Sequence, residues 1–374
     1  MANDSQVLGF RNDVSLNDGI YENQWSFSSN SNLGFQVDVG INYQWDVAAQ
    51  WVLMELDDED FNGFTRMAFL RYMPNQSWAI RAGRIPVDLF ELSEYRDVGI
   101  AFPWVKVPTE VYGFIPFRNL DGADLTYLSD IDDWHLEASL SYGSTEAEVT
   151  SSTDRPIKFH QLTGISMTLS AQSWSATVRH TEAQVARNNE STLFVLDSIN
   201  TLTPIWPDAP SFANQMNFSH HDARYTSVFA TYDWGAFRVS AEIAEVDSSS
   251  LLIDELYNGY FNLSYKKGDH TFYWLWSFAK SDEYIFSETL PDLPQVEQVI
   301  LLIEEVNTFY RANQISQSIG WRWDIKDNLA MKLQLQTTNV NAKGNGLWST
   351  KNDFRVLTPS ESVNIAMLNL SFNF

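Results

Sequence analysis

The residues best suited to chemistry lie in one stretch of the chain, residues 85–120, that fits no strand pattern. It mixes acidic and basic side chains, namely Asp88, Glu91, Glu94, Arg96, Asp97, Lys106, Glu110 and Arg118. A loop of this length inside a compact domain is usually functional or disordered, and its seven aromatic residues argue against disorder. Acidic and basic side chains that lie close together in a pore can make it selective for some solutes over others. We therefore interpret the stretch as a folded loop that narrows a pore.

Catalytic and metal chemistry have less support in the sequence. None of the six histidines stands at a spacing from another His, Asp or Glu that is typical of a zinc site. No GxSxG motif occurs either. An enzyme needs a nucleophile and a base brought together in space, and a sequence alone does not exclude that. We predict no metal site, cofactor or catalytic residue, and a hydrolase stays as an alternative.

Composition narrows the class of protein. The chain has 374 residues, no cysteine, 14 tryptophans and a mean hydropathy of −0.25. The sequence holds no run of about 18 apolar residues, which excludes a transmembrane helix. A membrane β-barrel has such averages because lipid-facing and lumen-facing residues alternate. The lack of cysteine fits an exported chain. Since no signal peptide precedes Asn3, we expect the mature form of such a chain.

The charge of the chain bears on its partners. The formal net charge is −24, which disfavours nucleic acid because phosphate backbones are bound by basic patches. Acidic residues crowd two segments, residues 57–60 and 282–305. Runs of this kind are most often solvated faces. In a membrane protein they would also suit divalent-cation bridges to lipopolysaccharide.

Strand patterns with a period of two residues recur along most of the chain. Phe35, Val37, Val39 and further apolar residues up to Trp45 alternate with polar ones, so that one face is wholly apolar. The predicted strands number sixteen, at residues 7–16, 34–46, 47–56, 62–73, 76–84, 121–129, 133–142, 161–170, 173–185, 222–233, 235–247, 254–266, 269–280, 311–324, 327–340 and 361–374. Tight turns follow the even strands and long segments follow most odd ones. A bacterial outer-membrane barrel requires this asymmetry.

Closure into a barrel has a physical reason. Sixteen strands in an open sheet would leave two unpaired edges, and in hydrocarbon every backbone polar group must be paired internally. A barrel of this width is too wide for side chains to fill. Its lumen is then open to water unless something folds inward, and 85–120 is the third long loop.

The last strand carries a family resemblance. Leu368, Leu370, Phe372 and Phe374 alternate with Asn369, Ser371 and Asn373, and the chain ends on Phe374. The LNLSFNF ending and the GRIP and DGAD stretches beside the third loop resemble the Gram-negative outer-membrane porins. At the level of pattern the resemblance covers nearly the whole chain, although the PEFGG loop motif of the family is absent.

The resemblance implies a constriction. In that family the third loop enters the lumen and carries acids opposite a ladder of basic residues on the wall. The residues implied for the loop side are Asp88, Glu91, Glu94, Arg96, Asp97, Glu110 and Arg118. The basic residues predicted to point inward are Arg11, Arg81, Arg179, Arg238, Arg322 and Lys332. Low-dielectric walls would focus the field between the two sets.

Taken together, we predict an all-β protein in which residues 1–374 form one transmembrane antiparallel barrel of 16 strands, with 85–120 folded into the lumen. The implied function is an outer-membrane porin, a passive diffusion channel for small hydrophilic solutes and ions. The resemblance also implies a homotrimer in contact with lipid and lipopolysaccharide. One alternative is a channel selective for sugars or organic acids, with Trp104, Tyr112 and Phe114 as a stacking track. Receptor, adhesin and outer-membrane hydrolase are further alternatives, and residues 295–306 are expected as a short helix or an extended strand.

Overall fold

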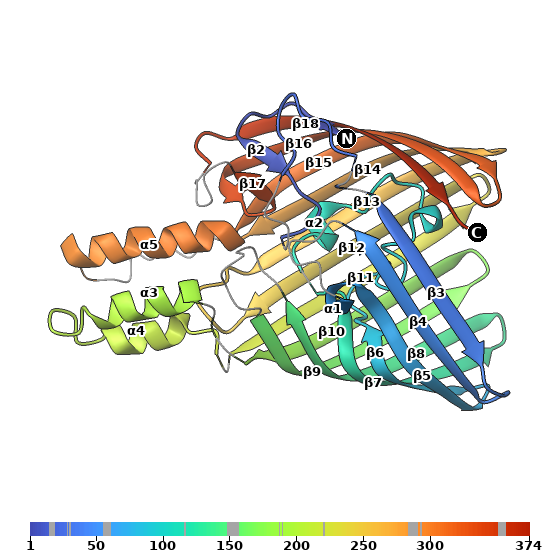
Figure 1. The fold of residues 1–374 in the computed structure, drawn as a ribbon, viewed down its shortest axis with the longest axis horizontal. Coiled ribbons are helices and arrows are strands. Elements are labelled where there is room, and N and C mark those ends of the chain that lie inside the picture. Colours follow the sequence, from blue (N-terminus) through green and yellow to red (C-terminus); the bar gives the residue numbers. More distant parts are fainter. Residues whose placement is uncertain are drawn as a thin grey trace.

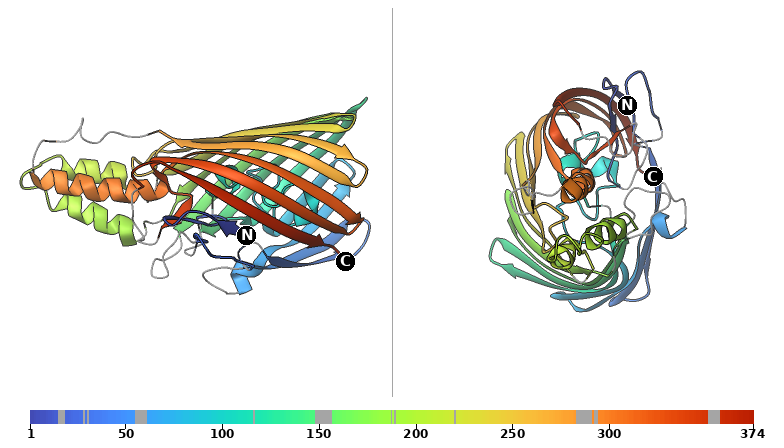
Figure 2. Two further views of the ribbon diagram at one scale, coloured as in Figure 1. Left: turned by 90° about the horizontal axis from the view of Figure 1, so that it is seen from above. Right: turned by 90° about the vertical axis from the view of Figure 1, so that its left-hand side faces the viewer.

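The main part of the structure is an antiparallel sheet that curls around a lumen (Figure 1, Figure 2). The structure is a computed structural model and describes residues 1–14, 19–27, 29, 31–54, 61–115, 117–147, 157–186, 188, 190–219, 221–282, 291, 294–350 and 357–374. Its sheet has sixteen strands in the order β1, β18, β16 and then β15 down to β3. The prediction of a sixteen-stranded antiparallel sheet is confirmed.

The strands match the predicted ones within a few residues at most ends. The wall consists of β3 (Asn32–Gly40), β4 (Trp45–Met54), β5 (Thr65–Asn75), β6 (Trp78–Pro86), β7 (Asn119–Ile131), β8 (Trp134–Ala147), β9 (Ile157–Ala171), β10 (Trp174–Val185), β11 (Asp222–Trp234), β12 (Phe237–Ser248), β13 (Leu256–Lys267), β14 (His270–Ser281), β15 (Ala312–Lys326), β16 (Leu329–Asn345), β18 (Glu361–Phe372) and the short β1 (Ala2–Asn3). Strand β5 begins later than predicted because residues before it form the short helix α1 (Phe61–Phe64).

Short turns lie at one end of the sheet and long connections at the other, as predicted. Two-residue turns join β5 to β6, β7 to β8, β9 to β10, β11 to β12, β13 to β14 and β15 to β16. Gly235 and Gly268 adopt positive φ angles of 61° and 58° in two of these turns, a conformation that glycine reaches without steric cost. Because these turns are so short, each pair of strands is joined directly, and the alternation of apolar and polar residues resumes within two residues.

The outer face is apolar and ends in aromatic rings near the short turns. Large exposed hydrophobic residues such as Leu140, Val178, Ile319 and Leu335 alternate with residues that face inward. Close to the turns, Trp45 stacks on Tyr72 with ring centroids 4.4 Å apart. Other pairs in this girdle are Trp134 with Trp174 at 5.0 Å and Trp321 with Trp323 at 6.3 Å. Such rings are favoured at membrane interfaces.

The predicted first strand, residues 7–16, is wrong. Only β2 (Leu8–Phe10) is extended there, and it pairs with β17 (Trp348–Thr350) in a separate two-stranded sheet. Leu8 and Phe10 are buried in an apolar cluster with Val363 and Ile365. The side chains of these two β18 residues alternate with the exposed outer face, so they point inward. An apolar period of two fits contact with lipid and contact with an apolar inner wall equally well, and here the second prevails.

The two edges of the sheet meet near the chain termini. Strand β1 pairs with β18 through Ala2 and Asn3, while β3 forms the other edge. The rings of Phe35 on β3 and Phe374 lie 6.5 Å apart across this seam. On the inner side of the seam, the Nδ2 of Asn32, the first residue of β3, donates a hydrogen bond to the carbonyl oxygen of Asp97 at 3.1 Å. The third loop therefore contacts the sheet edge from within.

Three helices extend beyond the end that carries the long connections (Figure 1, Figure 2). They are α3 (Glu190–Asn200), α4 (Ala209–Met216) and α5 (Pro294–Tyr310). They share a hydrophobic core that includes Ile199, Phe212, Met216 and Ile303. Helix α5 confirms the expectation of a helix at residues 295–306, while α3 and α4 lie in a segment predicted only as a loop. No helix in the described part of the chain has the length and apolarity needed to cross a membrane.

Candidate pore constriction

The third loop, called L3 below, runs from residue 87 to 118 between β6 and β7 and folds into the lumen. It contains the 3-10 helix η1 (Gly99–Ala101) and the short helix α2 (Thr109–Tyr112). The turn at its start is closed by Ser93, whose Oγ accepts hydrogen bonds from the backbone N–H groups of Leu89 and Phe90 at 3.1 and 2.8 Å. A side-chain acceptor of this kind satisfies donors that no strand partner reaches.

The aromatic residues of L3 pack against the wall. Phe90, Trp104 and Tyr112 are almost fully buried, together with Tyr225 and Tyr260 of the neighbouring strands. Trp104 Nε1 also donates a hydrogen bond to Asn262 Oδ1 at 2.8 Å. The proposed stacking track for sugars is therefore wrong for Trp104 and Tyr112, because their exposed fractions are 3% and 2%. Phe114 also packs against this core.

Glu110 anchors α2 to the wall. Its carboxylate accepts hydrogen bonds from Ser277 Oγ at 2.9 Å, from Gln314 Nε2 at 2.6 Å and from Ser316 Oγ. The side chain is buried, with an exposed fraction of 1%. Glu110 thus sits behind the surface of L3 that solutes would meet.

Two basic residues of the predicted ladder, on β15 and β16, donate hydrogen bonds to the backbone of L3. Lys332 Nζ donates to the carbonyl oxygens of Phe102 and Trp104, both at 2.8 Å, and to that of Gly99. Arg322 Nη1 donates to the carbonyl oxygens of Ile100 and Phe102 at 2.8 and 3.0 Å. Both cations therefore hold the chain around η1 against the wall formed by β15 and β16.

Two arginines of the ladder meet the acidic residues of L3. Arg179 pairs with Asp88 at 2.6 Å and with Glu91 at 3.0 Å. Arg81 pairs with Glu94 at 2.8 Å and, on β7, with Asp124 at 2.7 Å. The side chains of Asp88 and Glu94 are 41% and 42% exposed. These two carboxylates therefore face the water-filled part of the lumen.

The charge along this edge of L3 is negative. Glu137 on β8 interacts electrostatically with Asp88 and Glu94. With Glu91 and Asp124 there are five carboxylates around two guanidiniums, those of Arg81 and Arg179, which gives a formal charge of −3 (minus five plus two). Burial raises the pKa of Glu91 above its ordinary value, and Arg179 opposes this shift.

A second cluster lies where L3 approaches the seam. Asp97 accepts from Arg66 Nε at 3.1 Å and pairs with Arg118, and Arg118 also holds Asp13 at 2.9 Å. Burial opposes ionisation of Asp97, but the guanidiniums of Arg118, Arg66 and Arg96 outweigh it and hold the pKa of this carboxyl below its usual range. The Asp97 and Arg118 side chains thus form an internal ion-pair network.

The remaining residues of the predicted ladder lie elsewhere. Arg238 pairs with Asp233 at 2.6 Å beside the short turn between β11 and β12, far along the strand from L3. Arg11 is buried outside the wall strands and donates to the carbonyl oxygen of Gly346 at 2.6 Å.

Several residues around the constriction escaped the sequence analysis. Glu242 on β12 is fully buried and accepts hydrogen bonds from the N–H of Glu91 at 3.1 Å and from the hydroxyl of Tyr112 at 3.1 Å. Asp124, Glu137 and Arg66 also belong to the charged clusters. For Asp124 and Glu137, inward-facing positions in alternating strands were the available signal. Arg66 has the parity of the outward-facing Leu70 and lies at a register shift of β5, so alternation did not indicate it. Only the fold shows that L3 passes next to all three.

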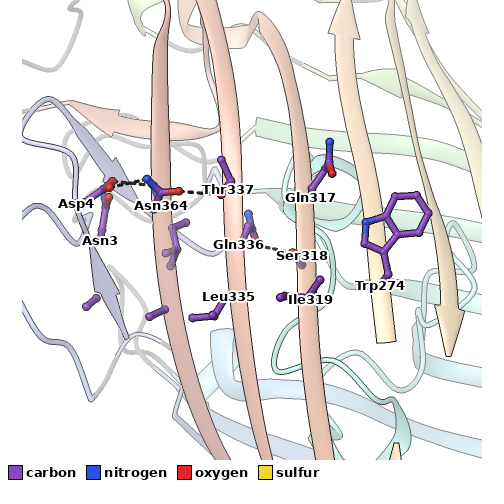
Figure 3. Close-up of a pocket in the computed structure, with 13 residues that line it drawn as sticks. Asn3, Asp4, Trp274, Gln317, Ser318, Ile319, Leu335, Gln336, Thr337 and Asn364 are labelled. Atoms are coloured by element: carbon purple, nitrogen blue, oxygen red, sulfur yellow. Dashed lines mark hydrogen bonds between the residues drawn. The ribbon is translucent and has the colours of Figure 1, made fainter. Parts of the chain in front are cut away.

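A groove lies on the outer face, away from L3 (Figure 3). It measures about 600 Å³ and is lined by apolar residues such as Trp274, Ile319 and Leu335. At its edge Asn364 Nδ2 donates to Asp4 Oδ2, and Thr337 Oγ1 donates to Asn364 Oδ1, both at 2.8 Å. This polar row marks the level at which the apolar outer face of β16 and β18 gives way to Asn339 and Ser362.

A sixteen-stranded antiparallel sheet rolled around an inward third loop defines the fold class of the outer-membrane porins. Solved structures of this class match nearly the full chain. The outer membrane channel DcaP of Acinetobacter baumannii is 11% identical with a TM-score of 0.56, and the match covers 99% of this chain and 93% of that one. The anion-selective porin from Comamonas acidovorans is 10% identical with a TM-score of 0.52, covering 93% and 91%.

A third similar structure is Salmonella typhi OmpF in complex with daunomycin, which is 13% identical with a TM-score of 0.51 and coverage of 91% and 89%. No family model matches the sequence. A search of curated proteins gives no match either. At this level of identity the likeness establishes the fold, and the function has to be argued from the site.

Proposed function

We propose that the protein is an outer-membrane porin, a passive diffusion channel for small hydrophilic solutes and ions that prefers cations. The observation that carries this proposal is the pair of half-exposed carboxylates, Asp88 and Glu94, on a loop inside the barrel. A cluster of formal charge −3 in a narrow, low-dielectric passage attracts cations and repels anions.

The outer face supports a membrane location. Its exposed apolar residues alternate with inward polar ones along β8, β10 and β15, which is the pattern of strands between lipid and water. The aromatic girdle at the short turns and the polar row of Asp4, Asn364 and Thr337 give the apolar band two boundaries. By the resemblance to porins, we infer a homotrimer in the outer membrane, with lipid and lipopolysaccharide around it.

Planar-bilayer recording tests the proposal. The purified protein is expected to give steady ohmic steps, with a reversal potential in a KCl gradient that shows cation preference. In the double variant Asp88→Asn with Glu94→Gln, the reversal potential should move toward that of anions. Glu146→Gln is the matched control, because Glu146 pairs with Lys158 at 3.0 Å away from L3 and its loss should leave selectivity unchanged.

A protein without conductance would refute the channel. An unchanged reversal potential in the double variant would remove Asp88 and Glu94 from the filter while leaving the channel intact.

A receptor function is the second candidate, and the three-helix unit favours it. Helices α3, α4 and α5 project beyond the sheet and share a hydrophobic core that reaches Val185 of β10 and Phe159 of β9, and such a unit is not needed for diffusion. Deleting residues 190–216 should leave conductance unchanged if the unit serves recognition, whereas loss of conductance would make it part of the channel.

A further inference from the structure

Tyr95 differs from the other aromatic residues of L3 in its exposure. The other six rings of residues 85–120 are buried or half-buried, and they pack against the wall or against one another. The side chain of Tyr95 is 53% exposed. Burial against the wall therefore does not account for an aromatic ring at this position.

The turn that carries Tyr95 is held firmly. The N–H of Tyr95 donates a hydrogen bond to the carbonyl oxygen of Leu92 at 2.9 Å. On one side Glu94 pairs with Arg81 of β6 at 2.8 Å, and on the other Asp97 pairs with two arginines. The ring is therefore presented to the lumen from a fixed piece of backbone, which is what a selective contact requires.

Carboxylates surround the exposed ring. Burial raises the pKa of the Tyr95 hydroxyl above its ordinary value, and the charges of Glu94 and Glu137 raise it further. Both acids thus lie within electrostatic reach of the hydroxyl. Glu137 is exposed on the inner face of β8, and Glu94 is half-exposed. The ring therefore belongs to the edge of formal charge −3 that solutes meet.

An aromatic face beside carboxylates distinguishes between cations. The carboxylates attract any cation, whether inorganic or organic. The face of a ring is the negative end of its quadrupole and attracts cations that come into contact with it, and quaternary ammonium groups are recognised in this way. A neutral sugar could stack on the ring, but it would gain nothing from the surrounding charge.

We propose that Tyr95 is a specificity-determining residue that favours organic cations with alkylated ammonium groups over alkali cations. The proposal rests on the channel function proposed above and adds the class of solute to it. The carboxylates of the edge supply the attraction for positive charge, and the ring of Tyr95 supplies the preference for an apolar surface around that charge.

Reversal potentials with KCl on one side of a planar bilayer and tetramethylammonium chloride on the other test the proposal. In the unmodified protein, the permeability of tetramethylammonium relative to potassium should exceed the ratio of their mobilities in free solution. Tyr95→Leu should lower this permeability ratio by about two- to fivefold, the factor expected for a cation over an exposed ring. Tyr95→Phe should retain it, because the ring is kept.

The direction of the change separates recognition from size. Leucine is smaller than tyrosine, so a purely steric role of Tyr95 predicts that the larger cation passes more readily in Tyr95→Leu. The reversal potential in a KCl gradient should stay as it is in the unmodified protein, because no formal charge changes. Tyr43→Leu is the matched control, since Tyr43 is an exposed tyrosine in the connection between β3 and β4.

Two results would overturn the role of Tyr95 while leaving the cation-preferring channel intact. One is a permeability ratio in Tyr95→Leu that equals or exceeds that of the unmodified protein. The other is a ratio in the unmodified protein no higher than the mobility ratio, and this result decides the question even if Tyr95→Leu fails to fold. Absence of any conductance in the unmodified protein would refute the channel itself.

Discussion

Arg179 on β10 holds Asp88 of L3 through an ion pair of 2.6 Å, although the two residues are 91 positions apart in the chain. The same guanidinium reaches Glu91 at 3.0 Å. One wall residue therefore both positions the acidic edge of the loop and offsets part of its charge.

Removing this cation should strengthen the cation preference of the channel. In Arg179→Gln the formal charge of the edge falls from −3 to −4, so the reversal potential in a KCl gradient should move further toward that of the cation. Current noise should also rise, because L3 loses two ion pairs. Arg238→Gln is the control at the short-turn rim, where Arg238 pairs with Asp233. A shift toward anions in Arg179→Gln would contradict the assigned edge.

Lys332→Met should loosen L3 around η1. Lys332 is fully buried and donates to three carbonyl oxygens of the loop. Its loss leaves these acceptors without their charged donor, at a cost of about 3 kcal/mol. Heat-modifiability on gels and thermal unfolding measure the loss. Lys326→Met, at an exposed position at the end of β15, should behave as the unmodified protein does; equal stability of the two variants would show that Lys332 does not anchor the loop.

Glu110→Gln should affect stability and leave ion selectivity unchanged. The carboxylate accepts three hydrogen bonds from Ser277, Gln314 and Ser316, and an amide presents an N–H group to donors in that position. A loss of about 2 kcal/mol is expected, measured by thermal unfolding. Glu137→Gln should behave in the opposite way: the reversal potential should change, and the stability should change little. A selectivity change in Glu110→Gln would place this residue in the conducting passage after all.

Lys106 should make stability depend on pH. Burial lowers the pKa of Lys106 to about 7, while Asp13 and Glu110 partly oppose this. Its folded pKa lies below the unfolded one, about 10.4, so the unfolded state binds more protons between these values. Stability from this group should therefore rise with pH from about 7 to about 10 and be constant below that window.

The variant Lys106→Met separates this contribution from other titrations. Methionine should be more stable than lysine at pH 6, since it removes a charge that burial takes out of water. The contacts of Lys106 with the ring of Phe10 and the carbonyl oxygen of Asn12 offset only part of that cost. The advantage should shrink as pH rises to 9. Lys266→Met, on the exposed end of β13, should show no such trend. An advantage that is independent of pH would show that Lys106 is not titrating in this window.

Local patterning sufficed for the wall strands and for the asymmetry of their connections. Alternation such as Phe35, Val37 and Val39 identifies an outer face because each side chain in a strand points opposite to the next. The same rule misplaced Leu8 and Phe10, since it does not state what the apolar face contacts. The helices α3 and α4 were missed because their apolar residues gain partners only in the folded chain, from each other, from α5 and from Val185 of β10.

For the charged residues too, the sequence indicated part of the site and the tertiary structure decided the rest. Composition and alternation indicated which carboxylates and bases belong to L3 and to the inner wall. Whether a charge faces water depends on packing: Asp88 stays half-exposed, Glu110 is buried among hydroxyl and amide groups, and Lys332 is buried under backbone carbonyls. The exposure of Asp88 and the burial of Glu110 and Lys332 follow from contacts between residues more than 90 positions apart.

The sequence by itself determined fifteen of the sixteen wall strands and the long third loop, because strand periodicity and turn chemistry are local properties. The sixteenth strand, β1, was not predicted. Only the tertiary structure decided which side of the lumen the loop contacts and which of its charges are neutralised. Ion pairing and burial depend on distances between distant segments, and the curvature of the sheet around L3 sets those distances.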